Sequence, residues 1–158
     1  MLITAPPSDA DGLSRARLRR PMTRPGRAEA AFERTGQPDL DARRPRQARR
    51  IATACLRLWG LSELVDSVCL ALSELVTNAF THGGGETVTV RLSFADGQLC
   101  FEVCNAGVWV AKPPFPDLLA QGGRGLLLVD AVADTWGITE DGTRVWCIIR
   151  VPQPEGSR

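Results

Sequence analysis

Residues 74–82 read Glu-Leu-Val-Thr-Asn-Ala-Phe-Thr-His, and this stretch decides the fold. It continues an apolar pattern of helical period that starts at Leu61. Glu74, Asn78 and His82 follow one another at intervals of four residues. The spacing therefore predicts that these three side chains line one edge of a long amphipathic helix.

A carboxylate one helical turn from a carboxamide, both beside a buried face, is costly unless a ligand uses them. Mg²⁺ prefers a few hard oxygen ligands and keeps several waters, so a cation that carries a nucleotide phosphate suits this pair. Glu74 would then orient or deprotonate a nucleophile beside the metal. The alternative is a polar strip at the edge of the core, which the spacing alone does not exclude.

Two helices are expected around this stretch. The first has Pro45 in its first turn and ends at Gly60. Ser62 is expected to cap the second helix, which the glycines at 83–85 end. The two helices are therefore joined by a short connection.

After the glycines the apolar period changes from 3.6 to 2, and Asp96-Gly97 and Asp141-Gly142 are turn signals. Each expected strand has one apolar and one polar face, as in a sheet covered on one side. The further expected elements are strands over 87–94, 99–103, 136–138 and 145–149 and a helix over 126–132. This order predicts an α+β fold, a two-layer sandwich with a mixed, mostly antiparallel sheet covered on one face by helices.

Charge is unevenly distributed along a chain of 158 residues whose formal net charge is only +1. Residues 1–50 hold 12 Arg against 6 acidic residues, whereas the rest of the chain is net negative. Many prolines and a weak apolar period near the N-terminus predict disorder there, with a short helix near 27–34. The expected division is a mostly disordered Arg/Pro-rich arm over 1–44, a domain over 45–151 and a tail over 152–158.

The five cysteines form no C-x-x-C pair and have no histidine at zinc-ligand spacing. We interpret them as small buried residues in a reducing cytoplasm, with a redox switch through Cys100 and Cys104 as the alternative. No apolar run approaches the roughly 20 residues that span a bilayer. The N-terminus lacks the charged and apolar regions of a secretory signal. We therefore expect a cytoplasmic protein without a membrane partner.

Three further motifs lie at the ends of expected elements. Asn105-Ala106-Gly107 follows the second strand, where the amide oxygen would accept a hydrogen bond from an exocyclic amine. Gly122-Gly123-Arg124-Gly125-Leu126 precedes a helix, where glycine amides, the helix N-terminus and a guanidinium favour an anion. Gly142-Thr143 enters the last strand and would place a hydroxyl beside a base. An ordinary turn explains each motif taken alone.

The order of the motifs is more specific than any one of them. The carriers are Ala48-Arg49, Leu58-Trp59-Gly60-Leu61, Ser73 to Ala79 with His82-Gly83, Gly123 to Leu126 with Val129, Ala133-Asp134, Trp136-Gly137 and Val145-Trp146. Together they resemble the Bergerat ATP-binding fold, whose superfamily includes histidine kinases and gyrase. Within it, the chain looks most like bacterial anti-sigma factor serine kinases of the SpoIIAB and RsbW type. The resemblance covers about residues 45–151.

This resemblance implies ATP and Mg²⁺ as cofactors and a role for each matching residue. Glu74 would act as the general base, and Asn78 would bind Mg²⁺ and through it the phosphates. Asn105 would contact the adenine amine. The other expected nucleotide-binding residues are His82, Gly107, Gly123, Arg124, Gly125, Leu126 and Thr143.

Two residues depart from the family pattern. Asn105 stands where the family usually has an Asp, and Trp109 stands where it often has a second glycine. A charge-assisted hydrogen bond is about twice as strong as a neutral one. The Asn is therefore expected to lower ATP affinity by ~1–2 kcal/mol, or about tenfold.

The leading hypothesis is an ATP/Mg²⁺-binding regulatory protein, a serine/threonine-protein kinase that phosphorylates an anti-sigma factor antagonist and sequesters a sigma factor. The resembled kinases are commonly homodimers. The alternative is a non-catalytic ATP-binding or protein-interaction module that regulates transcription. A third hypothesis, nucleic-acid association through the arm, is not favoured because no aromatic residue is interleaved with Arg15–Arg20.

Overall fold

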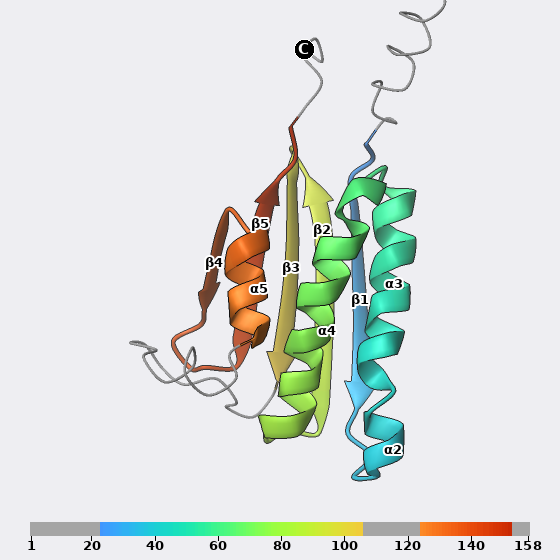
Figure 1. The fold of residues 1–158 in the computed structure, drawn as a ribbon, viewed down its shortest axis with the longest axis vertical. Helices are drawn as coiled ribbons and strands as arrows, with labels where there is room; N and C mark the ends of the chain where they lie inside the picture. Colours follow the sequence, from blue (N-terminus) through green and yellow to red (C-terminus); the bar gives the residue numbers. More distant parts are fainter. Residues whose placement is uncertain (1–22, 106–123, 153–158) are drawn as a thin grey trace, which may run out of the picture.

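The computed structural model describes residues 23–105 and 124–152. The fold has two layers, a five-stranded sheet and a layer of helices that covers one face of it (Figure 1). This confirms the predicted α+β sandwich. The strands are β1 (Gly26–Glu33), β2 (Thr87–Ala95), β3 (Gln98–Asn105), β4 (Thr135–Ile138) and β5 (Arg144–Arg150). The helices are α2 (Pro38–Asp41), α3 (Arg44–Leu58), α4 (Val65–His82) and α5 (Arg124–Val132), with a 3₁₀ turn, η1 (Ser62–Leu64).

The sheet has the order β1-β2-β3-β5-β4, and all four pairings are antiparallel. The expectation of a mixed sheet is therefore wrong for the strands that the structure describes. The physical reason is the place of β5. The helical crossover through α5 leaves β3 and β4 pointing the same way, but β5 turns back from β4 and lies between them (Figure 1). Two antiparallel pairings thus replace a parallel one.

Residues 26–33 form the edge strand β1 and not the short helix expected near 27–34. β1 pairs with β2 along its whole length, from Gly26 opposite Phe94 to Glu33 opposite Thr87. Its side chains alternate, and Phe32 is buried in the core. The folded unit therefore begins before residue 45, because β2 pairs with a strand from the segment expected to be disordered.

The two long helices match their expected positions. α3 begins with Pro45 in its first turn, and Gly60 follows it with a φ of 77°. Ser62, however, makes no capping hydrogen bond. It starts the 3₁₀ turn η1, which closes through a hydrogen bond from Leu64 N–H to the Leu61 carbonyl at 3.0 Å, and α4 begins only at Val65.

The span Ser62–His82 is long and apolar enough to cross a membrane when judged by length and composition alone. Most of its apolar residues, however, pack on the sheet and on the neighbouring helices α3 and α5. The fully buried side chains are Val68, Ala71, Leu72, Leu75, Val76 and Ala79. We therefore interpret α4 as the central core helix of the domain.

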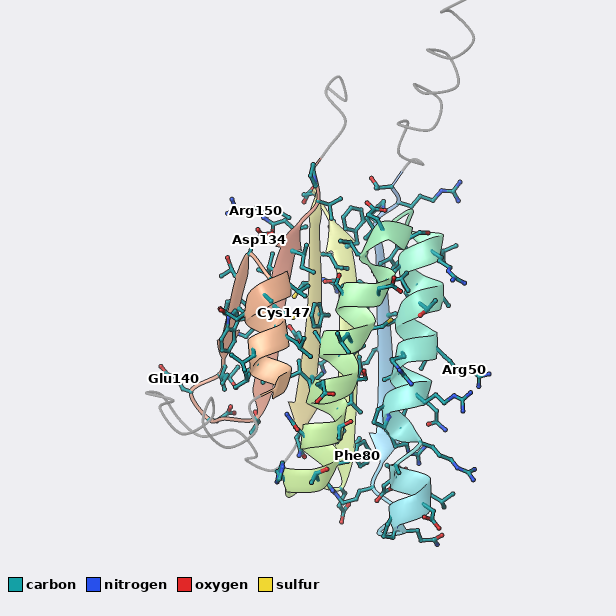
Figure 2. All side chains as sticks on the ribbon, viewed as in Figure 1. Arg50, Phe80, Asp134, Glu140, Cys147 and Arg150 are labelled. Atoms are coloured by element: carbon teal, nitrogen blue, oxygen red, sulfur yellow. The ribbon has the colours of Figure 1, made fainter. Side chains whose placement is uncertain are left out.

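The core lies between the two layers. Alternate residues of the strands point into it, and Phe101 at the centre of β3 is the largest side chain that is fully buried. Cys147 on β5 lies near the middle of the sheet in Figure 2, where its thiol donates to the Phe101 carbonyl at 3.2 Å. The predicted hairpin turns are confirmed, since Asp96 and Gly97 have φ values of 51° and 72°.

Candidate functional site

Several elements end at the same edge of the domain. β1, α4 and β3 all end at the lower edge in Figure 1, where α5 and β5 begin. Main-chain hydrogen bonds join these ends, such as Asn105 N–H to the Thr143 carbonyl at 2.8 Å. The fold therefore brings three of the expected regions together: the end of α4, the end of β3 and the start of β5.

Glu74, Asn78 and His82 lie on α4 as predicted, on successive turns of its last half. The side chains of Glu74 and Asn78 are half-buried, whereas His82 is exposed. No described residue forms a side-chain hydrogen bond or an ion pair with Glu74 or Asn78. Their oxygen atoms are therefore not used to hold the described part of the fold together.

Asn105 is the one buried polar residue among the described residues, with an exposed fraction of 1%. Its Nδ2 donates a hydrogen bond to the Ala79 carbonyl in the last turn of α4 at 3.4 Å. A Cβ atom on Gly83 would overlap this same Nδ2. The Asn105 side chain thus packs directly against the end of α4, one residue from Asn78. A carboxylate at this position would place acceptor against acceptor, which gives a structural reason for the departure from the family's Asp.

Thr143 is held in the turn between β4 and β5. Asp141 Oδ1 accepts hydrogen bonds from the Thr143 hydroxyl at 2.8 Å, from Thr143 N–H at 3.1 Å and from the Thr139 hydroxyl at 2.6 Å. The hydrogen bonds from Thr139 and Thr143 lower the pKa of Asp141 to about 2. The Thr143 proton is therefore used within the turn, and its oxygen would face a ligand as an acceptor.

The remaining expected residues are divided between the core and the undescribed part of the chain. Leu126, on the first turn of α5, is buried and belongs to the hydrophobic core. Arg124 and Gly125 form the start of α5. Gly107 and Gly123 lie outside the described residues, as does Trp109.

Sequence reasoning missed one residue at this edge. The Arg34 guanidinium, at the end of β1, donates three hydrogen bonds to main-chain carbonyls of the α4 end and the following loop. The visible signal was the partial alternation of Ala28, Ala30 and Phe32 with Arg27, Glu29 and Glu33, which is a weak pattern of a strand. The contacts themselves join residues 45 or more positions apart, which no local pattern reveals.

The cysteines do not form a redox or metal site among the described residues. All five are free, and Cys100 and Cys104 share the uncovered face of β3. Burial raises the pKa of both thiols, which is the opposite of what a reactive thiolate requires. No group of three or more His, Cys, Asp or Glu side chains gathers as a metal cage in the described residues. The predicted site for Mg²⁺ does not need one, because it would share the ion with phosphates and water.

The antiparallel sheet, the helical layer and the polar residues at one edge define an α+β domain with a candidate nucleotide site. The histidine kinase-like ATPase domain family matches residues 39–149. The chain belongs to this family, and the membership supports an ATP-binding regulatory role. No curated protein matched the chain.

The residues of the site fit Mg²⁺ and ATP, the ligands that the family implies. Glu74 and Asn78 supply a carboxylate and an amide oxygen one turn apart, the hard donors that Mg²⁺ prefers. Both side chains are partly open to solvent and have no described hydrogen-bond partner. The family membership leaves the reaction and the protein partners open.

Proposed function

We propose that this protein is a magnesium-dependent protein kinase that transfers a phosphoryl group from ATP to a serine of a partner protein. The partner would be an anti-sigma factor antagonist, and the kinase would also bind a sigma factor in the cytoplasm. One observation carries the proposal: Glu74 and Asn78 stand one turn apart on α4, and the end of this helix meets Asn105, which is bonded to Thr143.

Each residue would have a separate part in the reaction. Asn78 would hold Mg²⁺ through its amide oxygen, and the bound ion would neutralise charge on the phosphates. Glu74 would accept the proton of the partner's serine hydroxyl at its carboxylate. Phosphoryl transfer needs positioning and electrostatic stabilisation more than covalent help from the protein, so these few groups suffice.

Thr143 would line the side of the site away from the phosphates, and the buried Asn105, with an exposed fraction of 1%, would support that side from within. The peptide of Asn105 is fixed by its hydrogen bond to Thr143, and its side chain by the Ala79 carbonyl. A site whose polar groups are held before the ligand arrives loses less entropy on binding. His82, Gly107, Gly123, Arg124, Gly125 and Leu126 stay proposed contacts from the family resemblance.

The kinase proposal is tested by incubating the protein with γ-labelled ATP, Mg²⁺ and an anti-sigma factor antagonist from the same organism. Wild type is expected to label a serine of the antagonist. Glu74→Gln keeps the shape of the side chain but removes the proton acceptor, so transfer should fall by about 10²- to 10⁴-fold. The control is Asp66→Asn in the exposed first turn of α4, which should transfer at the wild-type rate.

Transfer that survives Glu74→Gln would contradict the role of Glu74, and absence of transfer by wild type would contradict the kinase proposal. A non-catalytic regulatory module is the second candidate. The observation that favours it is Asn105, whose carboxamide ties β3 to α4 where the family usually has a carboxylate for the base. Tight binding of the antagonist or sigma factor without turnover of ATP would support this second candidate.

A further inference from the structure

The guanidinium of Arg34 caps the C-terminal end of α4. Its Nε donates to the Gly85 carbonyl at 2.8 Å, Nη1 to the Phe80 carbonyl at 2.5 Å and Nη2 to the Ala79 carbonyl at 2.9 Å. The same guanidinium lies 5.3 Å from the centre of the Phe80 ring, which is at the lower end of α4 in Figure 2. This one side chain, directly after β1, therefore contacts the last turn of α4, the Phe80 ring of that turn and the loop that follows.

α4 has no glycine cap of the usual kind. Gly83 has φ −79° and ψ 154°, an extended conformation, and not the left-handed one that closes many helices. The main chain itself adds one hydrogen bond at this end, from Gly83 N–H to the Ala79 carbonyl at 3.0 Å. The last carbonyls of a helix lack intrahelical donors and carry partial negative charge, so the Arg34 cation supplies both donors and charge.

The last turn of α4 is held from two sides. The Ala79 carbonyl accepts hydrogen bonds from Arg34, directly after β1, and from Asn105 at the end of β3. Because Asn78 is joined directly to Ala79 in this turn, a displacement of the Ala79 peptide would also move the Asn78 side chain. The glycines 83–85, which follow α4, have no side chains, so they cannot hold the helix end in place of Arg34 and Asn105.

We propose that Arg34 is a positioning residue for the magnesium subsite at Asn78. It holds the last turn of α4 where the Asn78 amide oxygen reaches the ion and the phosphates. This inference rests on the proposed nucleotide-binding function. Arg34 directly follows β1 and precedes residues 39–149, so it lies outside the part of the chain that matches the family.

Arg44 offers a matched control. Its guanidinium lies 5.9 Å from the centre of the Phe32 ring and donates to the Glu33 carbonyl at 3.2 Å and to Gln47 Oε1 at 3.0 Å. It therefore makes the same kinds of contact as Arg34 but makes none of them with α4. Arg44→Ala should cost the fold a comparable number of polar contacts and leave the end of α4 in place.

The experiment measures ATP affinity of the full chain by calorimetric titration, with Mg²⁺ and again with EDTA. Wild type, Arg34→Ala, Arg34→Lys and Arg44→Ala are compared, and thermal melts without ligand report folding. Arg34→Ala is expected to bind ATP about tenfold more weakly with Mg²⁺, which corresponds to 1.4 kcal/mol. Its affinity in EDTA should equal that of wild type. Arg34→Lys keeps the charge but loses the forked arrangement of donors. Its ATP affinity with Mg²⁺ should therefore lie between those of wild type and Arg34→Ala.

Two further results complete the test. Arg44→Ala should bind ATP as tightly as wild type, both with Mg²⁺ and with EDTA. Added guanidinium at millimolar concentration should restore part of the magnesium-dependent ATP affinity of Arg34→Ala. A loss of equal size with and without Mg²⁺ would show a merely structural role and would overturn the inference. So would unchanged affinity in Arg34→Ala. If Arg34→Ala does not fold, Arg34→Lys decides by the same comparison.

The outcome for wild type separates this inference from the function on which it rests. Absence of magnesium-dependent ATP binding by wild type would overturn the proposed function and the inference with it. Magnesium-dependent binding by wild type that Arg34→Ala and Arg34→Lys retain in full would overturn the inference alone.

Discussion

The side-chain amide of Asn105, at the end of β3, donates a hydrogen bond to the main-chain carbonyl of Ala79 in the last turn of α4, at 3.4 Å. This contact joins the sheet to the helix that carries Glu74 and Asn78. At this position the side chain acts as a hydrogen-bond donor.

Replacing Asn105 by Asp should destabilise the fold at neutral pH. The carboxylate cannot donate to Ala79 and would be a buried charge, so the free energy of unfolding should fall by about 1–3 kcal/mol. Urea denaturation of Asn105→Asp and wild type measures the difference. An unchanged midpoint would contradict the assigned orientation of the amide.

The pH dependence of Asn105→Asp has a defined sign. Burial raises the pKa of a carboxyl in the folded state above its unfolded value of about 3.9. The folded state then binds the proton more tightly, so stability falls as pH rises from the unfolded pKa through the folded one. The protonated carboxyl can donate to Ala79. The deficit against wild type should therefore shrink on acidification, and a deficit that grows would contradict the account.

Gly83→Ala should destabilise the contact between the end of α4 and Asn105 of β3 through steric overlap. A Cβ atom there would overlap Asn105 Nδ2 and the Ala79 carbonyl, while the backbone at Gly83, with φ −79°, suits any residue. We expect a loss of about 1–3 kcal/mol. Gly84→Ala is the control, since a Cβ on Gly84 would meet nothing within 4 Å. Equal melting temperatures for the two variants would contradict the packing described here.

Asp141 should titrate far below an ordinary aspartate. The hydroxyls of Thr139 and Thr143 donate to its carboxylate and lower the pKa of Asp141 to about 2. Because this folded-state pKa is depressed, the turn gains its stabilisation above the unfolded value and loses it as pH falls toward 2. Carbon-detected NMR of the carboxyl measures the midpoint. Thr143→Val should raise it, and a wild-type midpoint near 3.8 would contradict the hydrogen bonds of the turn.

Gly26→Ala tests whether β1 belongs to the folded unit. A Cβ atom on Gly26 would overlap the indole of Trp59, which is buried at the end of α3. Overpacking of this kind costs about 1–3 kcal/mol, so the denaturation midpoint should fall. Ala31→Gly on the exposed side of β1 removes a side chain without touching Trp59 and gives the comparison for backbone effects. A Gly26→Ala variant as stable as wild type would contradict the docking of β1.

Much of this fold follows from local patterns. The helical period predicted α3 and α4, and the alternation after the glycines predicted β2, β3 and β5 with their turns. β1 was missed because its residues, Gly-Arg-Ala-Glu-Ala-Ala-Phe-Glu, include good helix formers, and its strand conformation comes from pairing with β2. Long-range pairing of this kind overrides local propensity, and a single sequence does not display it.

The candidate site was predictable only in part. Glu74, Asn78 and His82 were placed correctly, since one helix fixes their spacing. The hydrogen bonds from Arg34 and Asn105 to the Ala79 carbonyl were not predicted, because they depend on how β1, β3 and α4 pack. The same packing gives the amide at position 105 a contact with the end of α4, which the sequence pattern did not reveal.

The central claim is that Asn78 holds a magnesium-bound nucleotide at the end of α4. The most direct measurement is calorimetric titration of wild type and Asn78→Ala with ATP, each with and without Mg²⁺. The account predicts saturable binding by wild type that Mg²⁺ strengthens, and binding by Asn78→Ala that is at least about tenfold weaker and insensitive to Mg²⁺. Equal, magnesium-strengthened binding by both proteins, or no binding by wild type, would contradict it.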